Sequence, residues 1–259
     1  MSDQDRVIWN RVADEFDNKI GLNGDRDPFR ARCVDSMLLR ALTEEGVRDG
    51  ARVLDVGSGN GYFVRKLWAH GYDADGLDIS DGLLGIARAR SPGRVFHQAD
   101  IEATATLPHT KWDAITCSFV LDGLKNLDAA LSGLHLLLSP GGVLIVNIPH
   151  PAFIVPGTYG GAVGVSKSYA EQDDPEGSDY TMHHCKHPVR YYWRPLSKYV
   201  NAIVRSGFQV KSLIEPDPAE LHEYIGATER PRQRAYVLCI VAKREANDPA
   251  DAAAEFVAA

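Results

Sequence analysis

The chain has 259 residues, of which 44% are hydrophobic and 24% are charged, as in ordinary soluble globular proteins. Its formal net charge of -7 disfavours a surface built to neutralise phosphates, so we expect no nucleic-acid partner. The amino terminus is polar, no apolar run reaches membrane-spanning length, and the four cysteines are dispersed. We therefore expect a cytoplasmic protein with no membrane contact and no disulfide framework.

The helical and strand patterns divide the chain into three parts. Residues 1–48 carry two helical patterns separated by a loop at residues 21–28, and we expect this N-terminal helical cap to pack over the ligand edge of the next part. Residues 49–244 alternate short β-branched runs with helical patterns, which is typical of βαβ units and a parallel sheet. Residues 245–259 are rich in Ala and Asp and are predicted to form a flexible tail.

In chain order, the first five strands are predicted at residues 52–56, 73–79, 94–100, 112–119 and 143–148. Helices are predicted at residues 62–70 and 127–138, and another helix is predicted to begin after Ser80, which serves as its N-cap. Residues 139–142, Ser-Pro-Gly-Gly, are predicted to form a turn before the fifth strand. A helix at residues 195–205, ended by Gly207, precedes two closing strands at residues 208–214 and 234–242.

Residues 150–194 interrupt this pattern for a length that indicates a functional cover inserted in a compact domain. Its aromatic residues either pack the cover onto the sheet or line a substrate pocket; the aromatic and histidine residues are Tyr159, Tyr169, Tyr180, Tyr191, Tyr192, Trp193, His183, His184 and His187. No acidic residue or cysteine pair completes a recognisable ligand set around the histidines, so no metal is predicted.

A glycine-rich turn at Gly57, Gly59 and Gly61 follows the first strand, where backbone amides and a helix N-terminus can approach a ligand. A dinucleotide fold would have its third glycine at the position of Tyr62. Asp55, just before the turn, would repel a pyrophosphate but could face a cation. S-adenosylmethionine (SAM) fits these requirements because it carries an ammonium and a sulfonium group and no phosphate.

Two further aspartates end the next two strands. Asp78 is placed to accept hydrogen bonds from ribose hydroxyls, and Asp100 could bind an adenine amino group, with Ile79 and Ile101 as apolar contacts. Each aspartate alone is equally consistent with a helix cap or a turn. Their occurrence at consecutive strand ends favours a shared ligand groove.

These segments resemble the motifs of class I SAM-dependent methyltransferases. The first motif is Val-Leu-Asp-Val-Gly-Ser-Gly-Asn-Gly-Tyr-Phe at residues 53–63, and residues 76–80, 98–101, 119–122 and 138–142 resemble later ones. The resemblance implies an α/β, Rossmann-like fold with a seven-stranded, mostly parallel sheet, helices on both faces, and an antiparallel last strand beside the fifth. It implies SAM as cofactor, bound by Asp55, Gly57, Ser58, Gly59, Asp78, Ile79, Asp100, Ile101 and Ser118.

Residues 149–216 resemble a subgroup of small-molecule methyltransferases. We therefore predict a SAM-dependent methyltransferase that acts on an oxygen or nitrogen of a small molecule, with a role in secondary metabolism suggested by the resemblance. A protein or peptide substrate and a non-catalytic SAM-binding module are the alternatives. A short-chain dehydrogenase is disfavoured because the only Tyr-x-x-x-Lys spacing, Tyr62 to Lys66, lies beside the glycine turn.

A proton acceptor is needed if the substrate's methyl acceptor is a hydroxyl or a protonated amine, and none is needed for a carboxylate. His150, just past the fifth strand, is the first candidate, followed by the three histidines of the cover. Asp122 stands where the family pattern has a histidine. Arg30 and Arg194 could hold an anionic group or the cofactor carboxylate, and the predicted substrate contacts are Tyr159, His183, Tyr192 and Trp193.

Overall fold

The computed structural model describes residues 3–152, 169, 173, 175–182, 185–216 and 237–246. The strands of the main sheet are β1 Arg52–Val56, β2 Asp73–Asp78, β3 Phe96–Gln98, β4 Trp112–Ser118, β5 Leu138–Pro149, β8 Phe208–Ile214 and β9 Val237–Arg244. The α-helices are α1 Asp3–Arg11, α2 Ala13–Ile20, α3 Asp35–Glu44, α4 Tyr62–Ala69, α5 Asp81–Arg90, α6 Leu127–Leu137 and α7 Leu196–Arg205.

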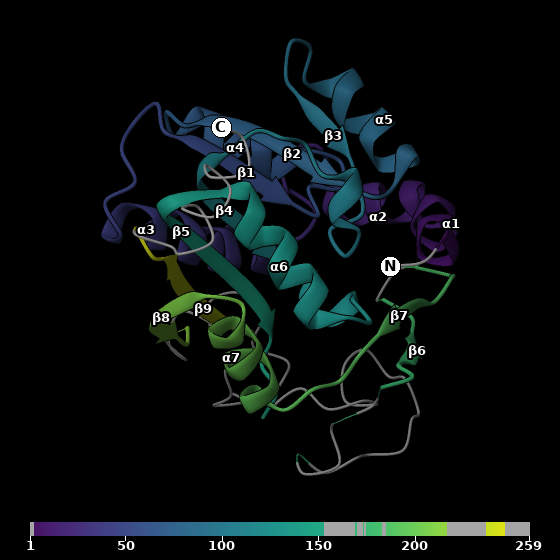
Figure 1. The fold of residues 1–259 in the computed structure, drawn as a ribbon. Helices are drawn as coiled ribbons and strands as arrows, with labels where there is room; N and C mark the ends of the chain where they lie inside the picture. Colours follow the sequence, from purple (N-terminus) through teal and green to yellow (C-terminus); the bar gives the residue numbers. More distant parts are fainter. Residues whose placement is uncertain are drawn as a thin grey trace.

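The main sheet has seven strands in the order β3-β2-β1-β4-β5-β9-β8 (Figure 1). Strands β1 to β5 pair in parallel, whereas β9 is antiparallel to both β5 and β8. The predicted seven-stranded, mostly parallel sheet with an antiparallel last strand beside the fifth is confirmed.

Alternating side chains build a hydrophobic layer on each face of the sheet. In β1, Leu54 and Val56 pack in the layer that contains residues of α6 and α7, and Val53 packs in the layer with residues of α3, α4 and α5. The two-residue repeat of a strand sends neighbouring side chains to opposite faces. Because both faces are covered, nearly every position of the central strands β1 and β4 is buried.

The predicted helix boundaries have identifiable caps. Ser80 Oγ accepts a hydrogen bond from the amide of Leu83 at 3.2 Å and begins α5, as predicted. Asn126 Oδ1 accepts one from the amide of Ala129 at 3.0 Å and begins α6. Gly207, with φ of +85°, follows α7.

The predicted turn at residues 139–142 lies inside β5, which begins at Leu138. Trp112 pairs with Leu138 and Ala114 with Val143, so the four residues of β5 form a bulge opposite Asp113. The glycines serve this bulge: Gly141 has φ of +76°, and a Cβ on Gly142 would lie 2.9 Å from the carbonyl oxygen of Asp113. Because β5 pairs with β4 on both sides of the bulge, the strand continues through residues 139–142, where the sequence predicted a turn.

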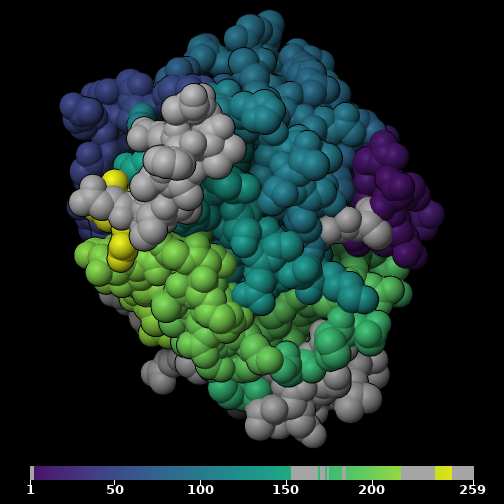
Figure 2. Space-filling view, viewed as in Figure 1, coloured from purple at the N-terminus to yellow at the C-terminus, as the bar shows by residue number. Residues whose placement is uncertain are grey.

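The N-terminal cap consists of α1 and α2, a π-helical turn at Arg30–Val34, and α3. Helices α1 and α2 pack against α5, and α1 also contacts β7 (Figure 1). In the space-filling view, the purple N-terminal residues form one edge of the molecule beside the green region of β7 (Figure 2). The cap therefore lies over the end of the sheet where ligands bind in folds of this type.

Part of the predicted cover forms a second sheet of two antiparallel strands, β6 Ser178–Tyr180 and β7 Val189–Tyr191. The sequence analysis did not anticipate these three-residue strands, which are too short to show a periodic pattern. Most of residues 153–174 lie outside the described residues. In the part of the chain that the structure describes, no helix is long and apolar enough to cross a membrane.

Candidate cofactor and substrate site

One cavity opens at the carboxyl ends of strands β1 to β5. The N-terminal cap closes it on one side and the β6-β7 sheet on another. Its described lining is Trp9, Phe16, Lys19, Asp27, Phe29, Arg30, Val56, Gly57, Gly59, Leu77, Asp78, Ile79, Leu83, Ala99, Ile101, Ser118, Phe119, Val120, Gly123, Pro149, Tyr180, Met182, Tyr191 and Trp193.

The cavity brings together most of the predicted cofactor residues, namely Gly57, Gly59, Asp78, Ile79, Ile101 and Ser118. Asp55 and Ser58 line a smaller adjoining pocket, which shares Gly57 and Ser118 with the cavity. Asp100 is not among the described lining residues; its Oδ1 accepts a hydrogen bond from the amide of Glu102 at 2.9 Å. The structure places Asp100 in a local turn between two lining residues, Ala99 and Ile101, and its contact with the adenine stays a prediction.

The glycine turn needs small residues because other side chains press against it. Gly57 has φ of +71°, and a Cβ there would lie 2.2 Å from Val120 Cγ2. A Cβ on Gly59, with φ of +53°, would lie 3.1 Å from Phe16. The bare backbone of this turn leaves a cradle along the cavity wall that any larger residue would fill. Such a cradle fits a ligand that lies against the backbone, as SAM does in the family that the sequence resembles.

Asp78 is fixed at the end of β2 by two backbone amides. Its Oδ2 accepts from Gly59 N and its Oδ1 from Ser80 N, each at 2.9 Å. Burial raises the pKa of Asp78, and the amide hydrogen bonds oppose this effect. A carboxylate has about four lone-pair sites, so the carboxylate of Asp78 can still accept a hydrogen bond from a ligand hydroxyl group.

Asp55 is 4% exposed, and its Oδ1 accepts a hydrogen bond from Thr116 Oγ1 at 2.9 Å. Burial raises the pKa of Asp55 to about 7, with Asp35 and Asp78 adding to the effect and Thr116 and Arg30 opposing it. A buried carboxyl of this kind is stabilised in its charged form by a cationic ligand. The ammonium group of SAM would supply that charge.

Arg30 lines both the cavity and the adjoining pocket. Its Nε donates to the Tyr62 hydroxyl at 2.9 Å, and that hydroxyl donates to Asp35 Oδ1 at 2.7 Å. Its guanidinium carbon lies 5.4 Å from the centre of the Phe119 ring. This arrangement fixes a positive charge where a ligand carboxylate can be bound.

Phe119 is a site residue that the sequence analysis did not single out. It follows β4 with φ of +57°, the only described non-glycine residue with positive φ, and its amide donates to Asn147 O at 2.8 Å. Left-handed backbone is rare for a bulky residue and is concentrated at functional sites. Here it turns the chain so that Phe119 and Val120 both face the cavity.

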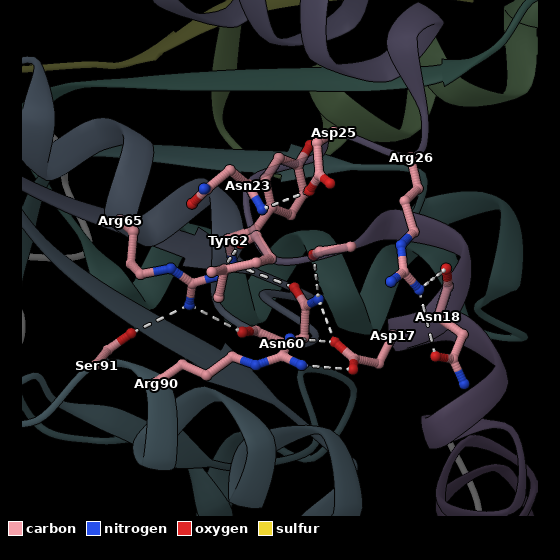
Figure 3. Close-up of polar contacts among 12 residues, drawn as sticks. Asp17, Asn18, Asn23, Asp25, Arg26, Asn60, Tyr62, Arg65, Arg90 and Ser91 are labelled. Atoms are coloured by element: carbon pink, nitrogen blue, oxygen red, sulfur yellow. Dashed lines mark hydrogen bonds and ion pairs between the residues drawn. The ribbon is translucent and has the colours of Figure 1, made fainter.

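A polar cluster joins the cap to the glycine turn (Figure 3). Asp17 of α2 binds Arg90 of α5, with 2.7 Å between Oδ2 and Nη2, and also accepts from Asn60 Nδ2 at 2.7 Å. Burial would raise the pKa of Asp17, but Arg90 and Asn60 overcome this effect and lower it. The cluster holds α2 in place and so positions Phe16 and Lys19 at the cavity.

Aromatic residues of the cover, Tyr180, Tyr191 and Trp193, form one wall of the cavity. The rings of Tyr180, Tyr191 and Trp193 contact one another, and the ring centre of Tyr191 lies 4.9 Å from that of Tyr180 and 5.5 Å from that of Trp193. Trp193 was a predicted substrate contact. For Tyr180 and Tyr191 the sequence left two alternatives open, packing of the cover onto the sheet and lining of a substrate pocket. Because all three residues line the cavity, the structure favours a role in a pocket over packing alone.

Tyr192 is buried outside the described lining of the cavity. Its amide donates to Asp122 O at 2.7 Å, and the Arg194 guanidinium lies 5.2 Å from its ring centre. Alternate residues of an extended chain point to opposite sides, so Tyr191 and Trp193 face the cavity and Tyr192 does not. The predicted contacts Tyr159 and His183 lie outside the described residues.

His150, the first candidate proton acceptor, is also placed away from the described lining. It is 5% exposed; its Nε2 lies 2.7 Å from Glu215 Oε1, and its Nδ1 accepts from the amide of Ala152 at 3.2 Å. With both ring nitrogens engaged outside the cavity, His150 fits a structural role at the end of β5 better than proton transfer.

The remaining candidates also have structural partners. Arg194 donates to the carbonyl oxygens of Leu121, Leu124 and Lys125, and thereby binds the loop after β4. His187 Nδ1 lies 2.9 Å from Glu15 Oε1, while His184 lies outside the described residues. Within the described ranges, no three His, Cys, Asp or Glu residues form a group that could hold a metal ion.

A seven-stranded sheet of this order, with a glycine turn after β1 and buried aspartates at the ends of β1 and β2, defines a class I SAM-dependent methyltransferase fold. Residues 27–212 match the methyltransferase domain family, so the chain belongs to this family. The prediction of SAM as cofactor is confirmed at the level of the family.

Among known proteins, the chain is similar to the demethylmenaquinone methyltransferase of Tropheryma whipplei (strain Twist), with 33% identity over 157 residues, or 58% of this chain and 62% of the relative. It is 35% identical over 98 residues to the malonyl-(acyl-carrier protein) O-methyltransferase of Serratia marcescens, over 38% of each chain. The matches thus span less than two thirds of these relatives. The solved S-adenosylmethionine-dependent methyltransferase of Mesorhizobium loti superposes with a TM-score of 0.59 and 26% identity, over 79% of this chain and 96% of that one.

Proposed function

We propose that this protein transfers the methyl group of SAM to an oxygen or nitrogen atom of a small molecule. The observation that carries the proposal is the continuity of one cavity from the glycine turn and Asp78 to the aromatic wall. A module that only binds SAM has no need for a second, aromatic compartment. A folded protein substrate would need an open groove, whereas the cap and the β6-β7 sheet border this cavity.

The residues around the cavity suggest how each part of SAM is held. Asp78 accepts hydrogen bonds from the ribose, and Ile79 and Ile101 provide apolar contact for the adenine. At the other end, Arg30 binds the carboxylate and Asp55 faces the ammonium group. This assignment leaves the sulfonium between the glycine turn and the aromatic wall.

The chemistry asks little of the protein beyond positioning. SAM supplies a methyl group that is already activated for displacement, so catalysis depends on holding the acceptor atom about 3 Å from it and in line. Tyr180, Tyr191 and Trp193 can orient a planar or apolar acceptor and exclude water. The relatives named for demethylmenaquinone and for a malonyl group on a carrier protein support an acceptor group of small-molecule size.

The proposal is tested by calorimetric titration of the protein with SAM and with S-adenosylhomocysteine (SAH). We expect micromolar binding that Asp78→Ala abolishes, while Asp73→Ala, an exposed position on the same strand, leaves the affinity unchanged. No binding of either ligand to the folded wild-type protein would refute the proposal. Binding without turnover across a broad panel of phenols, alcohols and amines would instead favour a non-catalytic SAM-binding module.

A further inference from the structure

A buried carboxyl group lies directly behind the aromatic wall. Asp122 belongs to the 3-10 turn Leu121–Gly123 after β4 and is 3% exposed. Among the described residues, no side chain completes a hydrogen bond of full geometry with either carboxylate oxygen, although the Tyr191 hydroxyl faces them. The amide of the next residue, Tyr192, donates to Asp122 O at 2.7 Å and so holds this turn against the end of β7. Burying such a group costs free energy unless it is compensated, and the Tyr191 hydroxyl is the side-chain donor placed to compensate it.

The groups that face Asp122 come from several elements. The Tyr191 hydroxyl of β7 is the side-chain donor that faces the carboxyl group, and Arg194 and Arg30 add positive charge at longer range. Tyr199 of α7 and Cys117 of β4 also face it. Burial raises the pKa of Asp122 to about 6, and Tyr191 and the two arginines limit the rise. Asp122 is therefore mainly ionised at neutral pH.

Tyr191 connects this carboxylate to the cavity. Burial, followed by the charge of Asp122, raises the pKa of Tyr191 well above its ordinary value, so the phenol keeps its proton. When the Tyr191 hydroxyl donates its proton to Asp122, the lone pairs of the Tyr191 oxygen can accept a hydrogen bond from a ligand in the cavity. Tyr191 lines the cavity, so this wall presents an acceptor backed by a negative charge.

We propose that Tyr191 and Asp122 form a proton-accepting pair, which selects substrates whose methyl acceptor is a hydroxyl or an amino group and disfavours carboxylates. This inference rests on the proposed methyltransferase function. It names Tyr191 as the catalytic residue that contacts the acceptor and Asp122 as the final proton acceptor. A substrate carboxylate at Tyr191 would have no proton to donate and would be repelled by Asp122.

For a hydroxyl acceptor, the transfer balances as follows. The acceptor oxygen forms a bond to the methyl carbon as the carbon–sulfur bond breaks, and the electron pair of that bond stays on sulfur. The acceptor proton passes to the Tyr191 oxygen while the phenolic proton passes to an oxygen of Asp122. The products are a methyl ether, SAH and a protonated Asp122, which returns its proton to solvent after release.

The test uses three probes of similar size that differ in the polar group: benzyl alcohol, benzylamine and benzoate. Each is titrated into the protein saturated with SAH. We expect the alcohol or the amine to bind about tenfold or more tightly than benzoate, because a hydrogen bond backed by a charge contributes about that factor. Asp122→Asn and Tyr191→Phe should each reduce this preference to about threefold or less.

Two further readouts separate this role from a structural one. The affinity for benzylamine should fall as the pH drops below about 6, and this fall should vanish in Asp122→Asn. Asp179→Asn, at an exposed position of β6, is the matched control and should behave as wild type. Should Asp122→Asn fail to fold, Tyr191→Phe keeps the test available, and the SAH affinity of each variant shows that its cofactor site is intact.

The inference is overturned if benzoate binds as tightly as the other probes, which would mean that Lys19 selects an anionic acceptor. It is also overturned if the SAH complex binds none of the three probes, or if both variants keep the wild-type preference. Failure of SAH itself to bind is a different result, because it refutes the methyltransferase proposal.

Discussion

Replacing Asp55 by asparagine should stabilise the ligand-free protein at alkaline pH and weaken its binding of SAM. The carboxyl group is buried, and Thr116 Oγ1 donates to its Oδ1 at 2.9 Å. Asparagine keeps an acceptor oxygen for Thr116 but cannot ionise. The variant therefore removes the charge and leaves the local packing almost unchanged.

The magnitude follows from the pKa of Asp55, which burial raises from 3.8 to about 7. Because the folded state binds this proton more tightly than the unfolded state, ionisation lowers the stability of the folded protein as the pH rises from about 4 to 7. At about 1.36 kcal/mol per pKa unit, the cost above pH 7 reaches at most about 4 kcal/mol. That corresponds to a difference of roughly 8–16 °C in Tm for a protein of this size.

Urea and thermal unfolding of both proteins between pH 4 and 8.5 measure this effect. The stability difference should be small at pH 4, grow until about pH 7 and then stay constant. Asp49→Asn, an exposed position, should show no such growth. A difference that is independent of pH, or an Asp55→Asn protein that is less stable than wild type at pH 8.5, would refute the assignment of a desolvated carboxyl group.

The ligand dependence of Asp55→Asn checks the second half of the prediction. SAH carries the ammonium group that Asp55 is proposed to face, whereas 5′-methylthioadenosine lacks it. The variant should weaken SAH binding about tenfold, in line with a hydrogen bond to a charged group, and leave 5′-methylthioadenosine unaffected. Equal losses for the two ligands would show that Asp55 does not face the amino-acid end of the cofactor.

Two other substitutions test the cradle and its support. Gly57→Ala should abolish SAH binding in calorimetry and lower the stability by about 1–3 kcal/mol more than the control Gly46→Ala. Both glycines have a left-handed φ, but of the two only Gly57 has a side chain within 4 Å of the added Cβ. Equal losses of stability in the two variants would mean that backbone strain alone is responsible. Asp17→Asn should lower stability by about 1 kcal/mol at pH 7 and weaken SAH binding, whereas Asp14→Asn, exposed on the same helix, should not. Because the pKa of Asp17 is lowered in the folded state, its contribution is present at neutral pH and is lost as the pH falls below about 4, and a loss that persists in acid would contradict the ion pair.

The sequence by itself determined the order of the elements and the set of residues proposed to hold the cofactor. Short apolar runs separated by amphipathic helices imply a parallel sheet, and the carboxyl ends of parallel strands lie at one edge of it. Gly57 and Asp78 could therefore be assigned to one groove although they are 21 positions apart. This reasoning works because strand ends are local features and the sheet relates them by a general rule.

Only the tertiary structure decided which residues of the cover line the cavity. The β6-β7 pairing of Ser178 with Tyr191 directs Tyr191 rather than Tyr192 into the cavity, and a shift of one residue would reverse the choice. Lys19 and Phe16 reach the cavity because a polar cluster anchors α2, and no local pattern in the sequence reveals that cluster. Likewise, Glu215 engages His150 across 65 positions, while Asp122 and Tyr191 meet across a turn and a separate sheet. Contacts between distant segments depend on how those segments pack, and packing is a property of the whole fold.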